Sequence, residues 1–232
     1  MRCEVCLPGC VPYRAAWDWQ NRLAEARGRD EILDRLLVLY HPHTYTLGSS
    51  GQDEHLLMPL EERARRGIEV LRVDRGGGIT YHGPGQLVVY PIIRLARAGG
   101  LRADALAYVR RLENVVLCLL ADYGVAGKTI PGLTGVWVDT PAGEQKICAI
   151  GVKITTRAIT KHGFALNLNT DLSYFEGIIP CGICDKGVTS LARLRGEPVD
   201  ENEAARRVIH HFGAAFGFEM VVLDGTTAAC AP

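Results

Sequence analysis

The sequence predicts an α/β (α+β) fold: a single domain, residues 1–232, with mixed, largely antiparallel sheets packed with helices. Three observations lead to this prediction. Apolar, strand-like runs are interleaved with helical patterns along the whole chain. Several neighbouring strands are separated only by short turns and are expected to form hairpins, which argues against a regular βαβ array. No repeat or low-complexity linker divides the sequence, and its length suffices for one large core.

The first half of the chain predicts short strands and two helices. Residues 32–40 are apolar and fit a helix or a strand, but Pro42 disfavours helical backbone before it and favours a buried strand. Pro12 suits the first turn of a helix, and glycines suit the helix ends. The elements expected here are a strand at 2–7, a helix from Pro12 to about Gly28, a strand ending at Tyr40, a loop at 44–48, a helix at 58–66 and a strand at 68–73.

The second half contains the clearest helical pattern, at residues 104–123. Apolar residues recur there at the spacing of one helical face: Leu106, Val109, Leu112, Val116 and Leu119. A Thr-Pro-Ala-Gly turn joins two strand-like runs and predicts a hairpin. The elements expected here are strands at 86–92, 135–138, 146–154, 163–168 and 219–223, and helices at 104–123 and about 200–216.

The charge balance argues against two classes of partner. The chain carries 26 Lys and Arg against 26 Asp and Glu, so its formal net charge is zero. Neither nucleic acid nor an anionic membrane is expected as a partner on this basis. The N-terminus lacks the basic and apolar segments of a secretory signal, and the apolar runs are too short to span a bilayer. We expect a cytoplasmic location.

The chain has eight cysteines, which a reducing cytoplasm would keep mostly as thiols. Cys3, Cys6 and Cys10 superficially resemble metal-ligand spacing. No second pair of Cys or His residues follows at zinc-finger distance, so no metal is expected. His41 and His43 are separated by one proline and have no third ligand nearby, which favours structural or pocket-lining roles.

Cys181 is the cysteine whose sequence context suits a nucleophile. It lies between Pro180, which restricts the backbone, and Gly182, which lets a carbonyl-bearing substrate approach the main chain. The same context fits an ordinary buried cysteine in a loop. Cys181 and Cys184 also form a CxxC motif, but its late position, outside a βαβ unit, makes thioredoxin-like redox activity the less favoured interpretation.

Two glycine-rich turns, at 75–78 and 83–85, flank the polar run Thr80-Tyr81-His82. Their spacing is neither the dinucleotide fingerprint nor a P-loop. A tight turn with a surface arginine is the simplest alternative. The two turns together favour a binding wall, because glycines leave room for a long acyl chain where side chains would not. His82 fits either a structural role or a substrate contact.

Lys146 begins the apolar run KICAIGV and is a candidate proton partner for Cys181. An inward-facing lysine is desolvated, which disfavours its ammonium form and lowers its pKa. A thiol beside it gains thiolate character, and the two residues would then act as nucleophile and base. The alternative is a surface lysine at the end of a hairpin, because separation in the sequence does not establish contact.

Three segments resemble the signature blocks of lipoyl(octanoyl) transferases, in the same order. They are RGGGITYHGPGQLVVYPI at 75–92, GEQKICAIGVKI at 143–154 and HGFALNLNTDLSYFEGIIPCGI at 162–183; HPHTYTLG at 41–48 resembles a fourth, more variable block. The resemblance covers the chain from about Tyr13 to Arg193. It implies a biotin/lipoate protein ligase-like fold, the catalytic core shared with lipoate ligases and biotin protein ligases.

The resemblance implies transfer of an octanoyl, or lipoyl, group in lipoate biosynthesis. The donor would be octanoyl-acyl carrier protein, and the acceptors would be lysines on the lipoyl domains of 2-oxoacid dehydrogenases and on the glycine cleavage H protein. No cofactor is implied, and we expect a monomer. The family's acyl-thioester cysteine falls on Cys181 and its pKa-lowering lysine on Lys146. The implied substrate contacts are Arg75, Gly76, Gly77, Gly78, Ile79, Thr80, Tyr81, His82, Ala149, Ile150, Gly151, Gly163, Phe164 and Ala165.

The chain departs from the family pattern at two cysteines. Cys148 stands where alanine is usual, and Cys184 stands where the family needs no thiol. From their spacing we hypothesise that Cys184 and Cys181 form a disulfide under oxidation that silences the enzyme; full activity of the air-oxidised protein would contradict this. Two other functions stay open: an ATP-dependent lipoate or biotin ligase of the same fold, which needs no nucleophilic cysteine, and a non-catalytic module that binds an acyl carrier.

Overall fold

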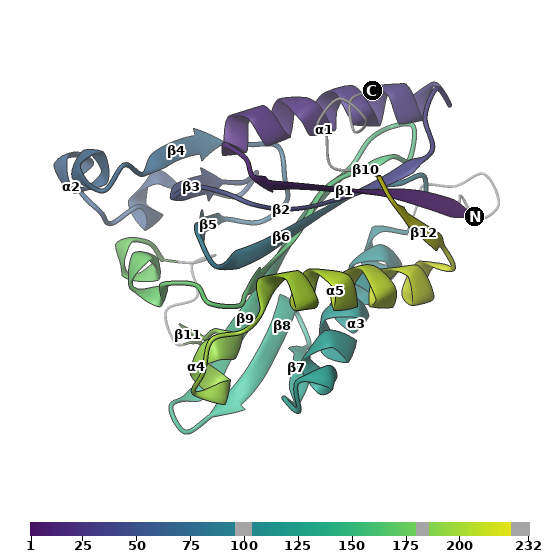
Figure 1. The fold of residues 1–232 in the computed structure, drawn as a ribbon. Helices are drawn as coiled ribbons and strands as arrows, with labels where there is room; N and C mark the ends of the chain where they lie inside the picture. Colours follow the sequence, from purple (N-terminus) through teal and green to yellow (C-terminus); the bar gives the residue numbers. More distant parts are fainter. Residues whose placement is uncertain (96–103, 180–185, 224–232) are drawn as a thin grey trace.

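The structure is a computed structural model, and it describes residues 1–95, 104–179 and 186–223 (Figure 1). Its helices are α1 (Tyr13–Gly28), α2 (Leu60–Arg65), α3 (Ala105–Asp122), α4 (Leu191–Arg195) and α5 (Glu201–Phe216), with the short 3₁₀ helices η1 (Asp53–His55) and η3 (Leu172–Gly177). Its strands are β1 (Arg2–Cys10), β2 (Asp34–Tyr40), β3 (Thr44–Leu47), β4 (Glu69–Arg72), β5 (Ile79–His82), β6 (Gln86–Ile92), β7 (Gly127–Ile130), β8 (Leu133–Thr140), β9 (Gly143–Ile154), β10 (Thr160–Asn167), β11 (Gly187–Val188) and β12 (Glu219–Val222).

The strands form a large sheet and a small sheet. The large sheet has the order β12-β1-β2-β6-β10-β9-β8-β7, with β11 also paired to β9, and the small sheet has the order β4-β3-β5. The β1–β12, β1–β2, β9–β11 and β3–β4 pairs are parallel, and the other pairs are antiparallel. The predicted fold class, mixed and largely antiparallel sheets packed with helices, is therefore confirmed. The division into a single domain stays a prediction.

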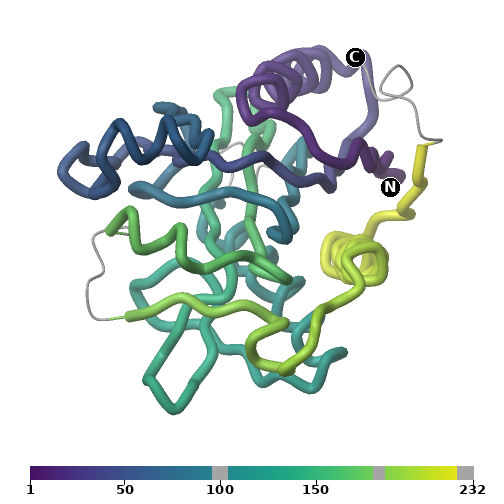
Figure 2. The backbone as a smooth tube through the Cα atoms, turned by 60° about the vertical axis from the view of Figure 1, so that its left-hand side comes forward, coloured from purple at the N-terminus to yellow at the C-terminus, as the bar shows by residue number. Residues whose placement is uncertain are grey.

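Helices cover both faces of the large sheet. α1 packs on one face, while α3 and α5 cover the other, and Figure 2 shows α1 (purple) well separated from α5 (yellow-green). In β2 the side chains of Leu36 and Val38 point toward α3 and α5, and those of Leu37 and Leu39 point toward α1. A strand that is buried on both faces carries apolar side chains on both, which is why residues 36–39 show no alternation of polarity.

The helix predicted at 104–123 is α3, and its buried face differs from the predicted one at the first turn. The carboxylate of Asp104 caps the helix by accepting a hydrogen bond from the Ala107 amide at 2.9 Å. Leu112 is fully buried, but Leu106 is 65% exposed. Leu106 lies six residues before Leu112, which rotates it by about 120° around the helix axis and turns it away from the core.

The loop expected at 44–48 is wrong, because Thr44–Leu47 form β3, the central strand of the small sheet. Tyr45 and Leu47 pack into a buried cluster on one side of this sheet. The strand has only four residues and is followed directly by Gly48, so its alternation is too short to recognise locally. Its partners β4 and β5 come later in the chain and supply the ladder that stabilises it.

The other predicted elements are confirmed within a few residues, and further short ones were not predicted. They include β5, β7, β11 and α4, which have four, four, two and five residues. Elements this short depend on their neighbours, because isolated short helices and strands are marginal in water. In the described part of the chain, no helix is long and apolar enough to cross a membrane.

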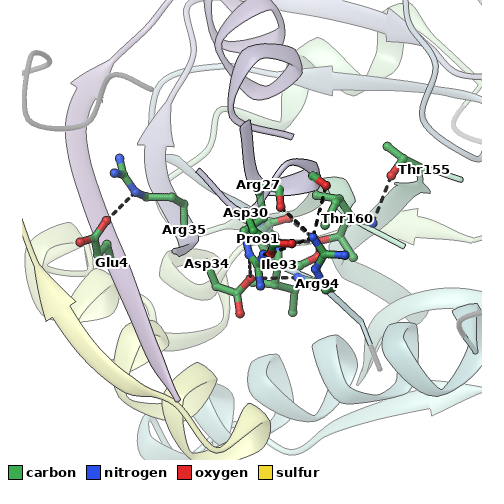
Figure 3. Close-up of polar contacts among 12 residues, drawn as sticks. Glu4, Arg27, Asp30, Asp34, Arg35, Pro91, Ile93, Arg94, Thr155 and Thr160 are labelled. Atoms are coloured by element: carbon green, nitrogen blue, oxygen red, sulfur yellow. Dashed lines mark hydrogen bonds and ion pairs between the residues drawn. The ribbon is translucent and has the colours of Figure 1, made fainter. Parts of the chain in front are cut away.

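A buried carboxylate ties the end of α1 to β2 and β6 (Figure 3). Asp34 Oδ1 accepts hydrogen bonds from Arg27 Nε at 2.7 Å and from the main-chain N–H of Arg94 at 2.9 Å. Asp30, in the turn between α1 and β2, contacts the side chains of the same two arginines. The side chain of Asp34 is 7% exposed, whereas that of Asp30 is 70% exposed. The two carboxylates therefore share partners but differ in solvation.

Replacing Asp34 with alanine should lower the free energy of unfolding by about 3 kcal/mol, because the Arg94 N–H loses its acceptor and the largely buried Arg27 guanidinium loses one of its two carboxylate partners. Asp30→Asn is the control, because Asp30 has a φ of 60° that asparagine tolerates, and an exposed pair of this kind contributes about 1 kcal/mol or less. Urea unfolding of the two variants measures the difference. Equal losses of unfolding free energy in the two variants would show that Asp34 does not stabilise the junction of α1, β2 and β6.

Candidate active site

A cavity of about 390 Å³ is lined by residues from both sheets. Its size is in the usual range of small-molecule sites, about 300–1,000 Å³. Most of the predicted site residues border it: Arg75, Gly76, Gly77, Thr80, His82, Lys146, Ala149, Ile150, Gly151, Gly163, Phe164 and Ala165. The fold therefore brings residues of the three sequence blocks together around one space.

Residues 79–82, expected as a polar run between two turns, form the strand β5. Successive side chains of a strand point to opposite sides. Thr80 and His82 consequently face the cavity, while Ile79 and Tyr81 pack into the cluster on the other side of the small sheet. Together with Gly78, which precedes the strand, Ile79 and Tyr81 are predicted site residues that lie outside the lining of the cavity.

The glycine loop at 75–78 is held against both sheets. The Gly76 amide donates to a carbonyl of β9 at 3.0 Å, and a Cβ placed on Gly151 of that strand would lie 2.8 Å from the Gly76 oxygen. The buried guanidinium of Arg75 donates to the Thr46 carbonyl at 2.6 Å and to the Thr46 hydroxyl at 2.8 Å. Arg75 thus fixes the loop to the small sheet while bordering the cavity.

Small residues of β9 and β10 form the floor of the cavity. Gly151 and Gly163 are partners across the two strands, and so are Ala149 and Ala165. A Cβ on Gly163 would lie 2.1 Å from the carbonyl oxygen of Val89, a distance that no real side chain shows. The two alanines keep the floor free of bulky side chains, and the two glycines let neighbouring backbone approach it closely.

A β-bulge turns Lys146 toward the cavity. The pairing of β8 with β9 places Trp137 opposite Lys146 and leaves Ile147 as an extra residue in β9. Ile147 and Cys148 consequently both pack into the core beside α3, whereas Lys146 and Ala149 both line the cavity. Burial raises the pKa of the Cys148 thiol well above its usual value, so this thiol stays protonated and does not compete as a nucleophile.

A chain of hydrogen bonds links the glycine loop to the main chain of Lys146. Each side chain in it donates to the next, because an arginine begins it and a main-chain carbonyl ends it. Its members are Arg75, Thr46, His82, Gln86, Asn167, Thr189 and the Lys146 carbonyl, with Thr189 contributing its main-chain oxygen and amide. The chain crosses from the small sheet through β6 and β10 to β9.

His82 occupies the middle of this chain as a neutral imidazole. Its Nδ1–H donates to Gln86 Oε1 at 2.9 Å, and its Nε2 accepts from the Thr46 hydroxyl at 3.3 Å. Burial holds the pKa of His82 far below its usual value, and the positive charge of Arg75 acts in the same direction. His82 therefore both lines the cavity and orders the network, which combines the two roles that its sequence context suggested.

Cys181 and Cys184 lie outside the described residues, and so does the disulfide hypothesised between them. The chain on either side is described. Before them, the Ile179 amide donates to the His55 carbonyl at 2.8 Å. After them, Val188 of β11 pairs with Lys146 of β9.

A second, much smaller cavity of about 20 Å³ adjoins Lys146. Phe175 of η3 and Val188 of β11 border it together with Lys146. These two residues precede and follow the stretch that contains Cys181 in the sequence. The described segments around the predicted nucleophile therefore both reach Lys146, although they are far from it in the sequence.

Within the three described ranges, no group of three or more His, Cys, Asp or Glu side chains is placed to hold a metal ion. Cys3 and Cys6 pack on opposite faces of the large sheet, and Cys10 is exposed. His41 Nδ1–H donates to a main-chain carbonyl at 2.6 Å, so its Nε2 accepts from the Tyr90 hydroxyl at 2.8 Å. Both ring nitrogens of His41 are thus engaged in hydrogen bonds within the protein.

The model of the family described as the lipoyl protein ligase A/B catalytic domain matches residues 12–213. The chain belongs to this family. It is 47% identical over 215 residues to the octanoyltransferase of Roseiflexus sp. (strain RS-1), which covers 93% of this chain and 88% of the relative. It is 49% identical over 211 residues to the octanoyltransferase of Chloroflexus aurantiacus (strain ATCC 29366 / DSM 635 / J-10-fl), which covers 91% of this chain and 92% of the relative.

The fold agrees with this membership. The structure is similar to that of the bipartite lipoate protein ligase from Thermoplasma acidophilum, with a TM-score of 0.73 at 18% identity over 96% of this chain and 88% of that chain. The predicted resemblance and the predicted lipoate protein ligase-like fold are both confirmed.

The cavity of this lipoyl protein ligase family member has further polar residues that sequence reasoning missed. Tyr13 of α1, Tyr90 of β6 and His162 of β10 also line it. Tyr13 is next to the helix-starting Pro12 and looks like an ordinary core aromatic in the sequence. His162 directly precedes Gly163, and its position at the start of an otherwise apolar run was the one available signal.

His162 is oriented by a carboxylate that precedes the glycine loop. Its Nε2–H donates to Asp74 Oδ1 at 2.8 Å, and Lys161 Nζ donates to Asp74 Oδ2 at 2.8 Å. The indole N–H of Trp17 reaches the same carboxylate at 3.0 Å. Burial lowers the pKa of His162, so it is neutral at pH 7 and its buried Nδ1 is a bare acceptor without a partner in the described part of the chain.

The Asp74 cluster should stabilise the fold in a pH-dependent manner. Hydrogen bonds from His162 and Lys161 hold the pKa of Asp74 well below its usual range. A lowered folded-state pKa contributes stability that is present above the unfolded pKa of about 3.9 and is lost as the pH falls further.

We expect Asp74→Asn to cost about 1 kcal/mol of unfolding free energy between pH 6 and 8, a modest value because solvent screens this partly exposed carboxylate. The difference from the wild type should shrink below about pH 4, where the Asp74 carboxylate of the unfolded chain begins to be protonated while that of the folded protein is still ionised. Urea unfolding at several pH values measures it, with the exposed Asp139→Asn as the control. A difference that is the same at pH 3 and pH 7 would contradict the assignment.

Proposed function

We propose that this protein transfers an octanoyl, or lipoyl, group from acyl carrier protein to a lysine of lipoyl domains through a thioester on Cys181. Membership of the lipoyl protein ligase A/B family and relatives named octanoyltransferase at 47% and 49% identity support an acyltransferase of lipoate biosynthesis. The observation that carries the proposal is the cavity with a floor of glycine and alanine that reaches the side chain of Lys146.

The cavity suits an acyl chain because its floor carries no bulky side chain and its walls are largely apolar. Val88, Ile150 and Phe164 contribute apolar surface along it. Each methylene removed from water contributes about 0.8 kcal/mol of binding free energy. A medium-length saturated chain is therefore held along β9 and β10, with its reactive carbonyl at the end where Lys146 lies.

In the first half-reaction the Cys181 thiolate attacks the carbonyl carbon of the donor thioester. A new carbon–sulfur bond forms, the bond to the carrier's phosphopantetheine sulfur breaks, and that sulfur leaves as a thiolate that takes up a proton from the Lys146 ammonium, which becomes neutral. The positive charge of Lys146 stabilises the attacking thiolate. One thioester replaces another, so the step is nearly balanced in free energy and consumes no nucleotide.

In the second half-reaction the target lysine attacks the acyl-enzyme. An amine with a pKa of about 10.4 is mostly ammonium at neutral pH, so it must lose a proton before it attacks. Lys146, in its neutral form, accepts that proton. An amide forms, and the Cys181 sulfur leaves as a thiolate ready for the next cycle.

The proposed donor is octanoyl-acyl carrier protein, and the proposed acceptors are the lipoyl domains of 2-oxoacid dehydrogenases and the glycine cleavage H protein. A cytoplasmic location and a monomeric state stay predictions. The second candidate, an ATP-dependent ligase, has the fold of the Thermoplasma acidophilum neighbour in its favour. Sequence identity favours octanoyl transfer, because the similarity to relatives of that name is far higher.

Incubation of the purified protein with octanoyl-acyl carrier protein, without ATP, should give an enzyme heavier by one octanoyl group. Cys181→Ser should abolish this mass increase, because the thioester cannot form. Cys10→Ser, which changes an exposed cysteine, should retain it. Intact-mass spectrometry reads both results. Full acylation of Cys181→Ser at the same position would rule out the nucleophile, and transfer that begins only when ATP is added would favour the ligase.

Lys146→Ala should raise the pH at which the Cys181 thiol reacts with iodoacetamide by about one unit, because a nearby positive charge stabilises the thiolate. Lys153→Ala, an exposed lysine of the same strand, is the control and should leave the pH profile unchanged. If the Lys146 variant has the wild-type profile, the lysine is structural.

A further inference from the structure

The aromatic ring of Trp137 lies directly beneath the amino group of Lys146. Trp137 and Lys146 are cross-strand partners in β8 and β9, and Lys146 Nζ lies 4.7 Å from the centroid of the Trp137 ring. This distance is within the range of about 6 Å in which an ammonium is attracted by the face of an aromatic ring, and tryptophan gives the strongest such attraction. The ring is 1% exposed, so the interaction is shielded from solvent on the side of the ring.

The backbone of β8 lies close to β9 beside the Trp137–Lys146 pair. Gly135 of β8 has a φ of 119°, which favours glycine, and a Cβ there would lie 2.6 Å from the Cys148 carbonyl and 3.5 Å from Lys146 Cε. The Gly135 amide donates to the buried carboxylate of Glu113 in α3 at 3.1 Å. A side chain at Gly135 would clash with the Cys148 carbonyl of β9 and would contact the lysine stem, so glycine lets β8 lie close to β9 beside Lys146.

Two carboxylates on neighbouring parts of the chain have cationic partners of their own. Glu144, two residues earlier in β9, binds Lys128 at 2.6 Å and Lys186 at 2.5 Å. Glu113 binds Arg110 at 2.5 Å in addition to the Gly135 amide. These carboxylates are therefore neutralised locally, and the ring of Trp137 is a distinct contributor to the environment of the ammonium.

Packing alone does not account for tryptophan at position 137. Its indole N–H is buried and has no hydrogen-bond partner among the described residues, which disfavours tryptophan relative to an apolar side chain. Trp137 is also outside the lining of both cavities beside Lys146, so it does not touch a ligand there. Its contact with the lysine is the feature that a phenylalanine or leucine would weaken or remove.

We propose that Trp137 is a positioning residue that holds the Lys146 ammonium at the edge of the cavity and so maintains the charge that activates the Cys181 thiol. The inference rests on the proposed function, because it assigns Trp137 an effect that passes through Lys146. The β-bulge at Ile147 places the lysine on the cavity side, and the Trp137 ring determines where along that side its charge lies.

The test is the pH dependence of Cys181 alkylation by iodoacetamide in the full-length protein. A Cys184→Ser background is used, so that the tryptic peptide 162–186 contains Cys181 as its one cysteine. Trp137→Leu removes the aromatic face, and Trp137→Phe keeps a weaker one. Each is made with and without Lys146→Ala. Val136→Ala, which truncates a buried residue on the opposite side of the same strand, controls for general loosening of β8.

We expect Trp137→Leu to raise the midpoint of the alkylation profile by about half a pH unit, a roughly threefold loss of thiolate at a given pH, and Trp137→Phe to raise it less. In the Lys146→Ala background Trp137→Leu should have no further effect. Val136→Ala should leave the midpoint unchanged, although it lowers stability.

Three results would overturn the inference, and they point to different errors. If Lys146→Ala shifts the midpoint but neither Trp137 variant does, Trp137 has no role and the proposed function is unaffected. If Trp137→Leu shifts the midpoint equally with and without Lys146, the ring acts on the thiol by another route. If Lys146→Ala itself causes no shift, the role proposed for the lysine is wrong and the inference is lost with it.

Discussion

The site depends on one continuous hydrogen-bond chain that joins the two sheets. It begins at the guanidinium of Arg75, passes through neutral His82 and ends at the main-chain carbonyl of Lys146. Because arginine only donates and a carbonyl only accepts, the direction of every bond between them is determined. Burial keeps His82 neutral, which its place in the chain requires. The glycine loop and the lysine are therefore held in one relative position by groups that have no alternative arrangement.

The cavity follows from this framework and from the choice of small residues. A Cβ on Gly151 would meet the Gly76 oxygen of the glycine loop, and one on Gly163 would meet the Val89 oxygen of the neighbouring strand, so glycine at these two positions lets the backbone approach closely beside the cavity. The bulge at Ile147 then reverses the alternation of β9, and Lys146 faces the same side as Ala149. The place of Lys146 at the edge of the cavity is therefore a consequence of one extra residue in β9.

Local sequence patterns predicted those elements whose own residues carry a recognisable signal, such as a helix cap or an apolar run. α1 begins after Pro12, α5 begins after the cap Asp200, and β2 and β6 consist mostly of apolar residues, so each was placed within a few residues. β3 was missed because its four residues derive their stability from β4 and β5. The same limit applies to Leu106, since the buried face of a helix is set by what packs on it.

The sequence by itself identified the family, the glycine loop and the small residues of the cavity floor, because each lies in a short contiguous motif. It also singled out Cys181 and Lys146 as the candidate nucleophile and its partner. Only the tertiary structure decided that Lys146 faces the cavity above an aromatic ring, since a bulge exists only relative to the strand opposite it. It also added Tyr13 and His162 to the site, because their proximity depends on how distant segments pack.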